Sequence, residues 1–169
     1  MSHLPMKPST SSNLSQQSIE HEINTIYYLS LNARLFYKTG LGNIGNPSIR
    51  ETFKNLKDLH ENVKNLLDGA SFNTSLSIKK WIIERRPIAI IIKHPPKRLI
   101  NRLIECEKLQ SFHQLKVIQS TGDSHLRMAL SALTAKQQTA IEQLEKHLIT
   151  LNQEKSMKTS SEKLGMKAA

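Results

Sequence analysis

Residues 46–69 read NPSIRETFKNLKDLHENVKNLLDG, and this stretch shows both ends and the buried face of an amphipathic helix. Asn46-Pro47 predicts the start, because an Asn side chain accepts from exposed backbone N–H groups and proline tolerates the first helical position. Asp68-Gly69 predicts the end. One face recurs at steps of four and three, as in a helix that buries one side, and consists of Ile49, Phe53, Leu56, His60, Val63 and Leu67.

Three further stretches show the same spacing and predict helices over about Ser18–Thr39, Pro96–Ser120 and Asp123–Leu151. Four helices of similar length can bury one another, so the sequence predicts an all-α four-helix bundle. The expected inward positions are Ile19, Ile23, Ile26, Ser30, Ala33 and Tyr37 in the first stretch, Leu99, Leu103, Cys106, Gln110 and Val117 in the second, and Leu126, Leu130, Leu133, Gln137, Ala140, Leu144 and Leu151 in the third.

The length of 169 residues is that of one domain with tails. Residues 1–18 and 152–169 are poor in large apolar side chains and rich in Ser and Lys, which predicts disorder. Residues 19–151 then form the bundle. The short connection before Asn46 makes the first two helices antiparallel neighbours.

Residues 70–96 form the long connection between the second and third predicted helices. Ser77–Arg86 can form a short amphipathic helix, and Pro87 interrupts it. The run Ile88–Ile92 is β-branched, so it is either a strand or helical. This connection is interpreted as a crossover between two helical hairpins, as in ferritin-like bundles.

The net charge of +10 is concentrated near this crossover. Between Lys79 and Arg102 the chain has eight basic residues and a single acidic one, Glu84. This basic run is either the solvated side of an amphipathic cover or a surface that binds nucleic acid or acidic lipid headgroups. The basic residues are Lys79, Lys80, Arg85, Arg86, Lys93, Lys97, Arg98 and Arg102.

A polar residue interrupts each predicted stripe near its middle: Ser30, His60, Gln110 and Gln137. A di-iron site would require inward carboxylates on all four helices and Glu-x-x-His on two, and that set is missing. Only His60, with Glu107 nearby, could bind a metal. The favoured interpretation is a hydrogen-bonded layer that sets the helix register, in which His60 is satisfied by Ser30 or a glutamine. No cofactor is expected.

Cys106 is the single cysteine, so no intramolecular disulfide can form and a reducing compartment is expected. Its position predicts a small buried apolar residue. No phosphate loop, catalytic triad or carboxylate pair occurs, so no enzymatic activity is expected. Without a signal peptide or an apolar stretch of about 18 residues, a cytoplasmic protein is expected, with signal-peptide-independent secretion through the C-terminal tail as the alternative.

Four short stretches, in order, carry a resemblance that spans about Glu20–Leu151. They are Ala33–Tyr37, Asn46–Arg50 with Phe53, Ser75–Trp81 and Leu103–Glu107. On these stretches the chain resembles a bacterial family of ferritin-like four-helix-bundle proteins known only as a domain of unknown function. Family members are commonly acidic after the Cys-Glu step and aromatic farther along, where this chain has Gln110 and Val117. The resemblance implies a fold and no specific activity.

These features favour a non-enzymatic bundle protein that acts through association, as a homo-oligomer or with a protein partner. The isoleucine run motivates this expectation, since apolar surface commonly marks an interface. One alternative is a degenerate metal-binding or redox bundle with His60 and Glu107 as surviving ligands. The other is anion binding through Lys79–Arg102.

Overall fold

The computed structural model describes residues 10–42, 44–68 and 96–165, and this part of the chain is helical with no strand. The predicted all-α class is confirmed. Within these ranges, none of the helices has the length and apolar character needed to cross a bilayer. The helices are α1 (Thr10–Gly40), α2 (Pro47–Asp68), α5 (Pro96–Ser120) and α6 (Ser124–Gly165).

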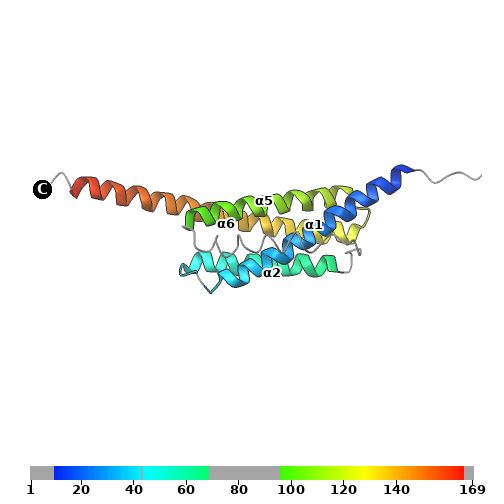
Figure 1. Ribbon diagram of the computed structural model, residues 1–169, viewed down its shortest axis with the longest axis horizontal. Coiled ribbons are helices and arrows are strands. Elements are labelled where there is room, and N and C mark those ends of the chain that lie inside the picture. The colour runs from blue at the N-terminus through cyan, green and yellow to red at the C-terminus, as the bar shows by residue number, and fades with distance from the viewer. Residues whose placement is uncertain (1–9, 43, 69–95, 166–169) are drawn as a thin grey trace, which may run out of the picture.

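The four helices pack lengthwise as a bundle (Figure 1). α1 packs against α2 and α5, and α6 packs against α5 and α2. The first turns of α1 and the last part of α6 extend past the bundle at opposite ends. Each helix therefore has two main neighbours, which enclose the core between them.

Side-chain caps fix where two of the helices begin. The backbone N–H groups of Ser48 and Ile49 donate to Asn46 Oδ1 at 3.0 and 3.2 Å, which confirms the predicted start of α2. Asp123 caps the first turn of α6 in the same way. α2 ends at Asp68, as predicted.

Two helices are longer than the sequence indicated. α1 begins at Thr10 and α6 ends at Gly165, beyond the predicted bounds at Ser18 and Leu151. Those bounds followed the apolar stripe, and a shortage of large apolar residues limits burial and not helicity. Neither extension contains a proline or an internal glycine. A helix already nucleated in the bundle can therefore extend one residue at a time. α5 keeps its predicted bounds.

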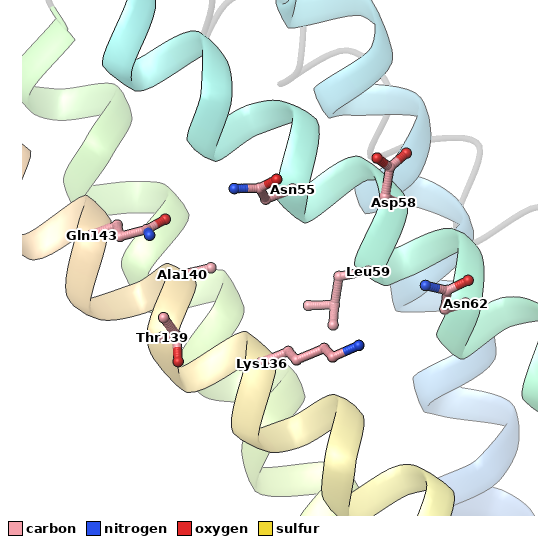
Figure 2. A pocket seen from close by; sticks show the side chains of 8 residues that line it. All are labelled: Asn55, Asp58, Leu59, Asn62, Lys136, Thr139, Ala140 and Gln143. Atoms are coloured by element: carbon pink, nitrogen blue, oxygen red, sulfur yellow. The ribbon is translucent and has the colours of Figure 1, made fainter.

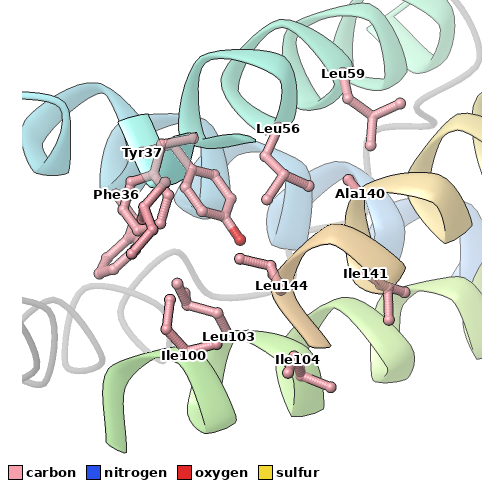
Figure 3. Close-up of a cluster of buried hydrophobic side chains, with 12 residues drawn as sticks. Phe36, Tyr37, Leu56, Leu59, Ile100, Leu103, Ile104, Ala140, Ile141 and Leu144 are labelled. Atoms are coloured by element: carbon pink, nitrogen blue, oxygen red, sulfur yellow. The ribbon is translucent and has the colours of Figure 1, made fainter. Parts of the chain in front are cut away.

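The apolar core consists of two clusters along the bundle axis. The first surrounds Phe53 and is drawn in Figure 3. The second surrounds Ile26 and Leu130. All six residues predicted for the inward face of α2 are buried and contribute to this interior. The first cluster consists of Phe36, Tyr37, Ile49, Phe53, Leu56, Leu59, Ile100, Leu103, Ile104, Ala140, Ile141 and Leu144, and the second of Ile23, Ile26, Val63, Leu67, Val117, Leu126 and Leu130.

Cys106 is exposed, so its predicted burial is wrong. The inward face of α5 passes through Leu103, Glu107 and Gln110, which are all buried. Cys106 precedes Glu107 by one residue, and one residue is a rotation of about 100° around a helix. The inward step therefore falls on the carboxylate and leaves the thiol at the surface.

Candidate functional site: a buried polar cluster

The four residues predicted as a polar layer lie in the interior, one on each helix. Ser30, His60 and Gln137 are fully buried, and Gln110 is 2% exposed. They lie between the two apolar clusters along the axis, and Glu107 of α5 joins them. The buried polar cluster, as the term is used below, consists of Ser30, Tyr37, His60, Glu107, Gln110, Ser111 and Gln137.

Glu107 is the centre of this cluster. Its Oε1 accepts from the Tyr37 hydroxyl at 2.5 Å and from His60 Nε2 at 3.1 Å. Its Oε2 accepts from Gln137 Nε2 at 2.6 Å. The carboxylate is 2% exposed and receives donors from α1, α2 and α6. The Glu107 side chain thus connects α5 to the other three helices. A buried carboxylate is tolerated when several donors hydrogen-bond to it, and Glu107 has three.

His60 and Gln110 extend the cluster toward α1. Gln110 Nε2 donates to Ser30 Oγ at 2.7 Å and lies 3.3 Å from His60 Nδ1. The His60 ring stacks on Tyr37, with 5.7 Å between centroids and 9° between planes. Both ring nitrogens of His60 therefore have partners within the protein, one of them a glutamine.

Gln137 completes the cluster on the α6 side. Its Oε1 accepts from Ser111 Oγ at 3.1 Å, and its Nε2 also lies 3.3 Å from the backbone oxygen of Glu107. Donor and acceptor ends of this amide are therefore both bonded. Such a cluster holds only when the four helices keep one register, since a shift of any one helix would leave polar atoms unpaired in the core.

His60 and Glu107, the two candidate metal ligands, are hydrogen-bonded to each other. Across residues 10–42, 44–68 and 96–165, no group of three or more His, Cys, Asp or Glu side chains gathers as a metal site would require. What these residues form is a closed hydrogen-bond cluster. A substrate would have no access to the Glu107 carboxylate at its exposure of 2%.

Two pKa values in the cluster are shifted. Burial raises the pKa of Glu107, but attraction to His60 and hydrogen bonds from His60, Tyr37 and Gln137 outweigh it and hold the pKa below its ordinary 4.5. Burial and the nearby Glu107 carboxylate raise the pKa of Tyr37 well above its ordinary 10. At neutral pH the carboxylate is therefore ionised and the Tyr37 hydroxyl keeps its proton.

The lowered pKa of Glu107 predicts a loss of stability in acid. A carboxyl whose pKa is lower in the folded chain stabilises it fully above the unfolded pKa of about 4.5 and less as the pH falls through the folded value. We expect the free energy of unfolding to decrease as the pH is lowered from 6 to below 4.5, measured by urea denaturation. Glu107→Gln should weaken this dependence. An unchanged pH profile in that variant would contradict the prediction.

Gln114 is a buried polar residue that the sequence reasoning missed. It follows Gln110 by four residues, which is an inward step and the signal that could have identified it. Its Oε1 accepts from Thr134 Oγ1 at 2.7 Å. Its Nε2 has no hydrogen-bond partner in the described part of the chain. The inner side of α5 is therefore polar for a turn beyond the cluster.

Of the candidate anion-binding residues, three belong to described parts of the chain. Lys97, Arg98 and Arg102 are exposed in the first turns of α5. Arg102 Nη1 lies 3.2 Å from Glu105 Oε2, so part of this charge is balanced locally. The others lie outside the described residues: Lys79, Lys80, Arg85, Arg86 and Lys93, together with residues 69–95 of the crossover and the isoleucine run within it.

An open pocket of about 330 Å³ lies between α2 and α6 (Figure 2). Neutral amides supply much of its lining, including Asn55, Asn62 and Gln143. Its carboxylate, Asp58, already pairs with Lys57 at 2.9 Å. None of the predicted site residues lines this pocket, so it is separate from the buried polar cluster.

The outer side of α5 carries three large apolar residues that are largely exposed. Leu109, Phe112 and Leu115 are 53%, 55% and 46% exposed and follow one another at steps of three. These residues are called the apolar α5 face below. They are on the opposite side of the helix from Glu107 and Gln110, since at about 100° per residue Phe112 lies about 140° around the helix from Glu107 and about 200° from Gln110. They fall outside the inward stripe of α5, so the periodicity of the sequence does not single them out.

Comparison with known proteins gives no relative for this chain. No protein-family model, curated protein or solved structure matches it. The resemblance to ferritin-like bundle proteins therefore stays an expectation from the sequence.

Proposed function

We propose that this chain is a non-enzymatic helical-bundle protein that acts by association with protein, through the apolar α5 face. The observation that carries the proposal is the exposure of Leu109, Phe112 and Leu115 in one row, at 53%, 55% and 46%. A contiguous exposed apolar patch commonly marks a protein interface. Aromatic side chains such as Phe112 are also enriched in the buried cores of interfaces.

The placement of the acid–base groups supports the non-enzymatic part of the proposal. Glu107 and His60 are 2% and 0% exposed and are hydrogen-bonded to each other. A general acid or base must come within hydrogen-bond reach of a reacting group. These two groups contact only the protein interior, where their role is to hold the helices in register.

The proposal includes a ferritin-like antiparallel topology. Lys108 of α5 pairs with Glu145 of α6, whereas the later Gln114 bonds the earlier Thr134, so contacts run in opposite directions along the two helices. The same reversal relates α1 to α2. α2 ends at residue 68 and α5 begins at residue 96, which leaves room for a long crossover between the hairpins.

The proposed location is the cytoplasm. The chain has one cysteine, and Cys106 lies at the surface. Reducing compartments favour proteins whose stability does not depend on disulfides.

Site-specific photo-crosslinking tests the association. A photoreactive phenylalanine analogue replaces Phe112 in cells that express the full chain, and the matched control places it at Ile149, which is equally exposed at 55% on α6. We expect an adduct at position 112, with the cross-linked peptide identified by mass spectrometry, and little at position 149. Absence of an adduct at position 112 would rule out association through this face.

A further inference from the structure

We infer that the partner at the apolar α5 face is a second copy of this chain, with the two α5 helices crossing antiparallel at Phe112. This inference rests on the proposed function, because it names the partner of the same face. Three observations carry it: the symmetry of the sequence around Phe112, the symmetry of the exposed face, and the pairing of the flanking charges.

Residues 108–116 read KLQSFHQLK, which is the same in both directions except for Ser111 and His113. On the helix, Leu109 and Leu115 lie about 60° to either side of Phe112, one turn before it and one turn after it. Both are exposed, together with Phe112. The apolar α5 face is therefore nearly symmetric about Phe112.

A two-fold contact uses the same patch on both copies, so that residue i meets residue j and j meets i. With the axis at Phe112, Leu109 of each copy faces Leu115 of the other, and the two Phe112 rings meet at the centre. Every apolar residue of the face then meets another apolar residue. An unrelated partner would place no such symmetry requirement on α5.

The lysines on either side of the face do not oppose this contact. Lys108 pairs with Glu145 of α6 at 2.7 Å, and Lys116 pairs with Glu22 of α1 at 2.8 Å. In the crossing, Lys108 of one copy approaches Lys116 of the other, and each brings a carboxylate, although Glu22 is shared between Lys116 and His113. Lys116 also lies 4.6 Å from the centre of the Phe112 ring, which places its charge against the apolar face.

This local balance matters because the whole chain carries a net charge of +10, which would drive two copies apart. On either side of the apolar α5 face, a lysine of α5 forms an ion pair with another helix: Lys108 with Glu145 of α6, and Lys116 with Glu22 of α1. The bundle itself therefore supplies the acidic groups that neutralise the edges of the contact. An isolated α5 peptide would carry the same lysines without these carboxylates.

Sedimentation equilibrium of the purified full chain measures the association. We expect a mass of twice 19.2 kDa for the wild type. Phe112→Glu should raise the dissociation constant about 30-fold or more, as for the loss of a central interface residue. Ile149→Glu is the matched control and should leave it unchanged, with circular dichroism verifying the helix content of both. A monomer at all concentrations, or a dimer insensitive to Phe112→Glu, would overturn the inference.

Cysteine cross-linking tests the register. In a Cys106→Ser background, Phe112→Cys should form a disulfide-linked dimer with itself, because it lies on the two-fold axis. Leu109→Cys should cross-link to Leu115→Cys when the two proteins are mixed, and each should react poorly alone. Efficient linkage of Leu109→Cys to itself would overturn the antiparallel crossing.

The two proposals fail separately. If the chain is a monomer and the probe at position 112 cross-links a different protein, the association function holds and the second copy is ruled out as the partner. If neither a dimer nor an adduct forms, both proposals fall.

Discussion

Replacing Glu107 with alanine is expected to lower the free energy of unfolding by about 3–5 kcal/mol, because it leaves three buried donors without an acceptor at about 1–3 kcal/mol each. The carboxylate accepts from Tyr37, His60 and Gln137, and all three side chains would lose an acceptor inside the core. An unpaired buried polar group loses its interaction with water without compensation. Urea denaturation followed by circular dichroism measures the change.

Glu105 provides the matched control for this experiment. It lies two residues away on α5, its side chain is 66% exposed, and it pairs with Arg102 at the surface. Glu105→Ala should change the free energy of unfolding by about 0.5 kcal/mol or less, as exposed ion pairs contribute little. If Glu107→Ala cost no more than this control, the buried polar cluster would not stabilise the bundle.

Replacing Phe53 with alanine is expected to lower the free energy of unfolding by about 3–5 kcal/mol, as for other buried phenylalanines. Phe53 is fully buried, and its ring packs edge-on against Tyr37 at 5.0 Å and beside Phe36 at 6.0 Å between centroids. Removal of the ring would leave a cavity where the end of α1 packs against the beginning of α2. Thermal or urea denaturation gives the value, with Met128→Ala, at 70% exposed, as the surface control.

Gly40 provides a second check on the packing around Phe53. A Cβ added at Gly40 would lie 2.9 Å from Phe53 Cε2, closer than side chains tolerate. Gly40→Ala should therefore destabilise the wild type and cost less in the Phe53→Ala background, because the ring it meets is gone. Strictly additive effects of the two substitutions would show that this contact is not what limits residue 40.

Local signals in the sequence were sufficient for much of the fold. The starts of α2 and α5 follow from a cap and from prolines and their ends from Gly69 and Gly122, and all six inward positions of α2 are buried as predicted. Periodicity placed the start of α1 and the end of α6 too far inward, because both helices continue over residues 10–17 and 152–165 beyond the predicted bounds. A segment without an internal proline or glycine can continue a helix even where no apolar stripe predicts one.

The residues of the candidate site also fall into two groups, those that periodicity predicts and those that depend on helix packing. Periodicity identified Ser30, His60, Gln110 and Gln137, because a polar residue on an apolar stripe is visible in one helix at a time. It could not identify Glu107 as the carboxylate that His60 and Gln137 share, since that depends on which of two adjacent residues, Cys106 or Glu107, turns inward when α5 packs. Packing against the neighbouring helices decides which of these two side chains is buried.

The sequence by itself determined that this chain forms amphipathic helices, where α2 and α5 begin and end, and that polar residues interrupt the inward faces. Only the tertiary structure decided that Tyr37, His60 and Gln137 converge on one carboxylate, and that Leu109, Phe112 and Leu115 remain outside the bundle. The physical reason is that periodicity reports the faces of a single helix, whereas hydrogen-bond partners and exposed surface depend on which helices lie next to it.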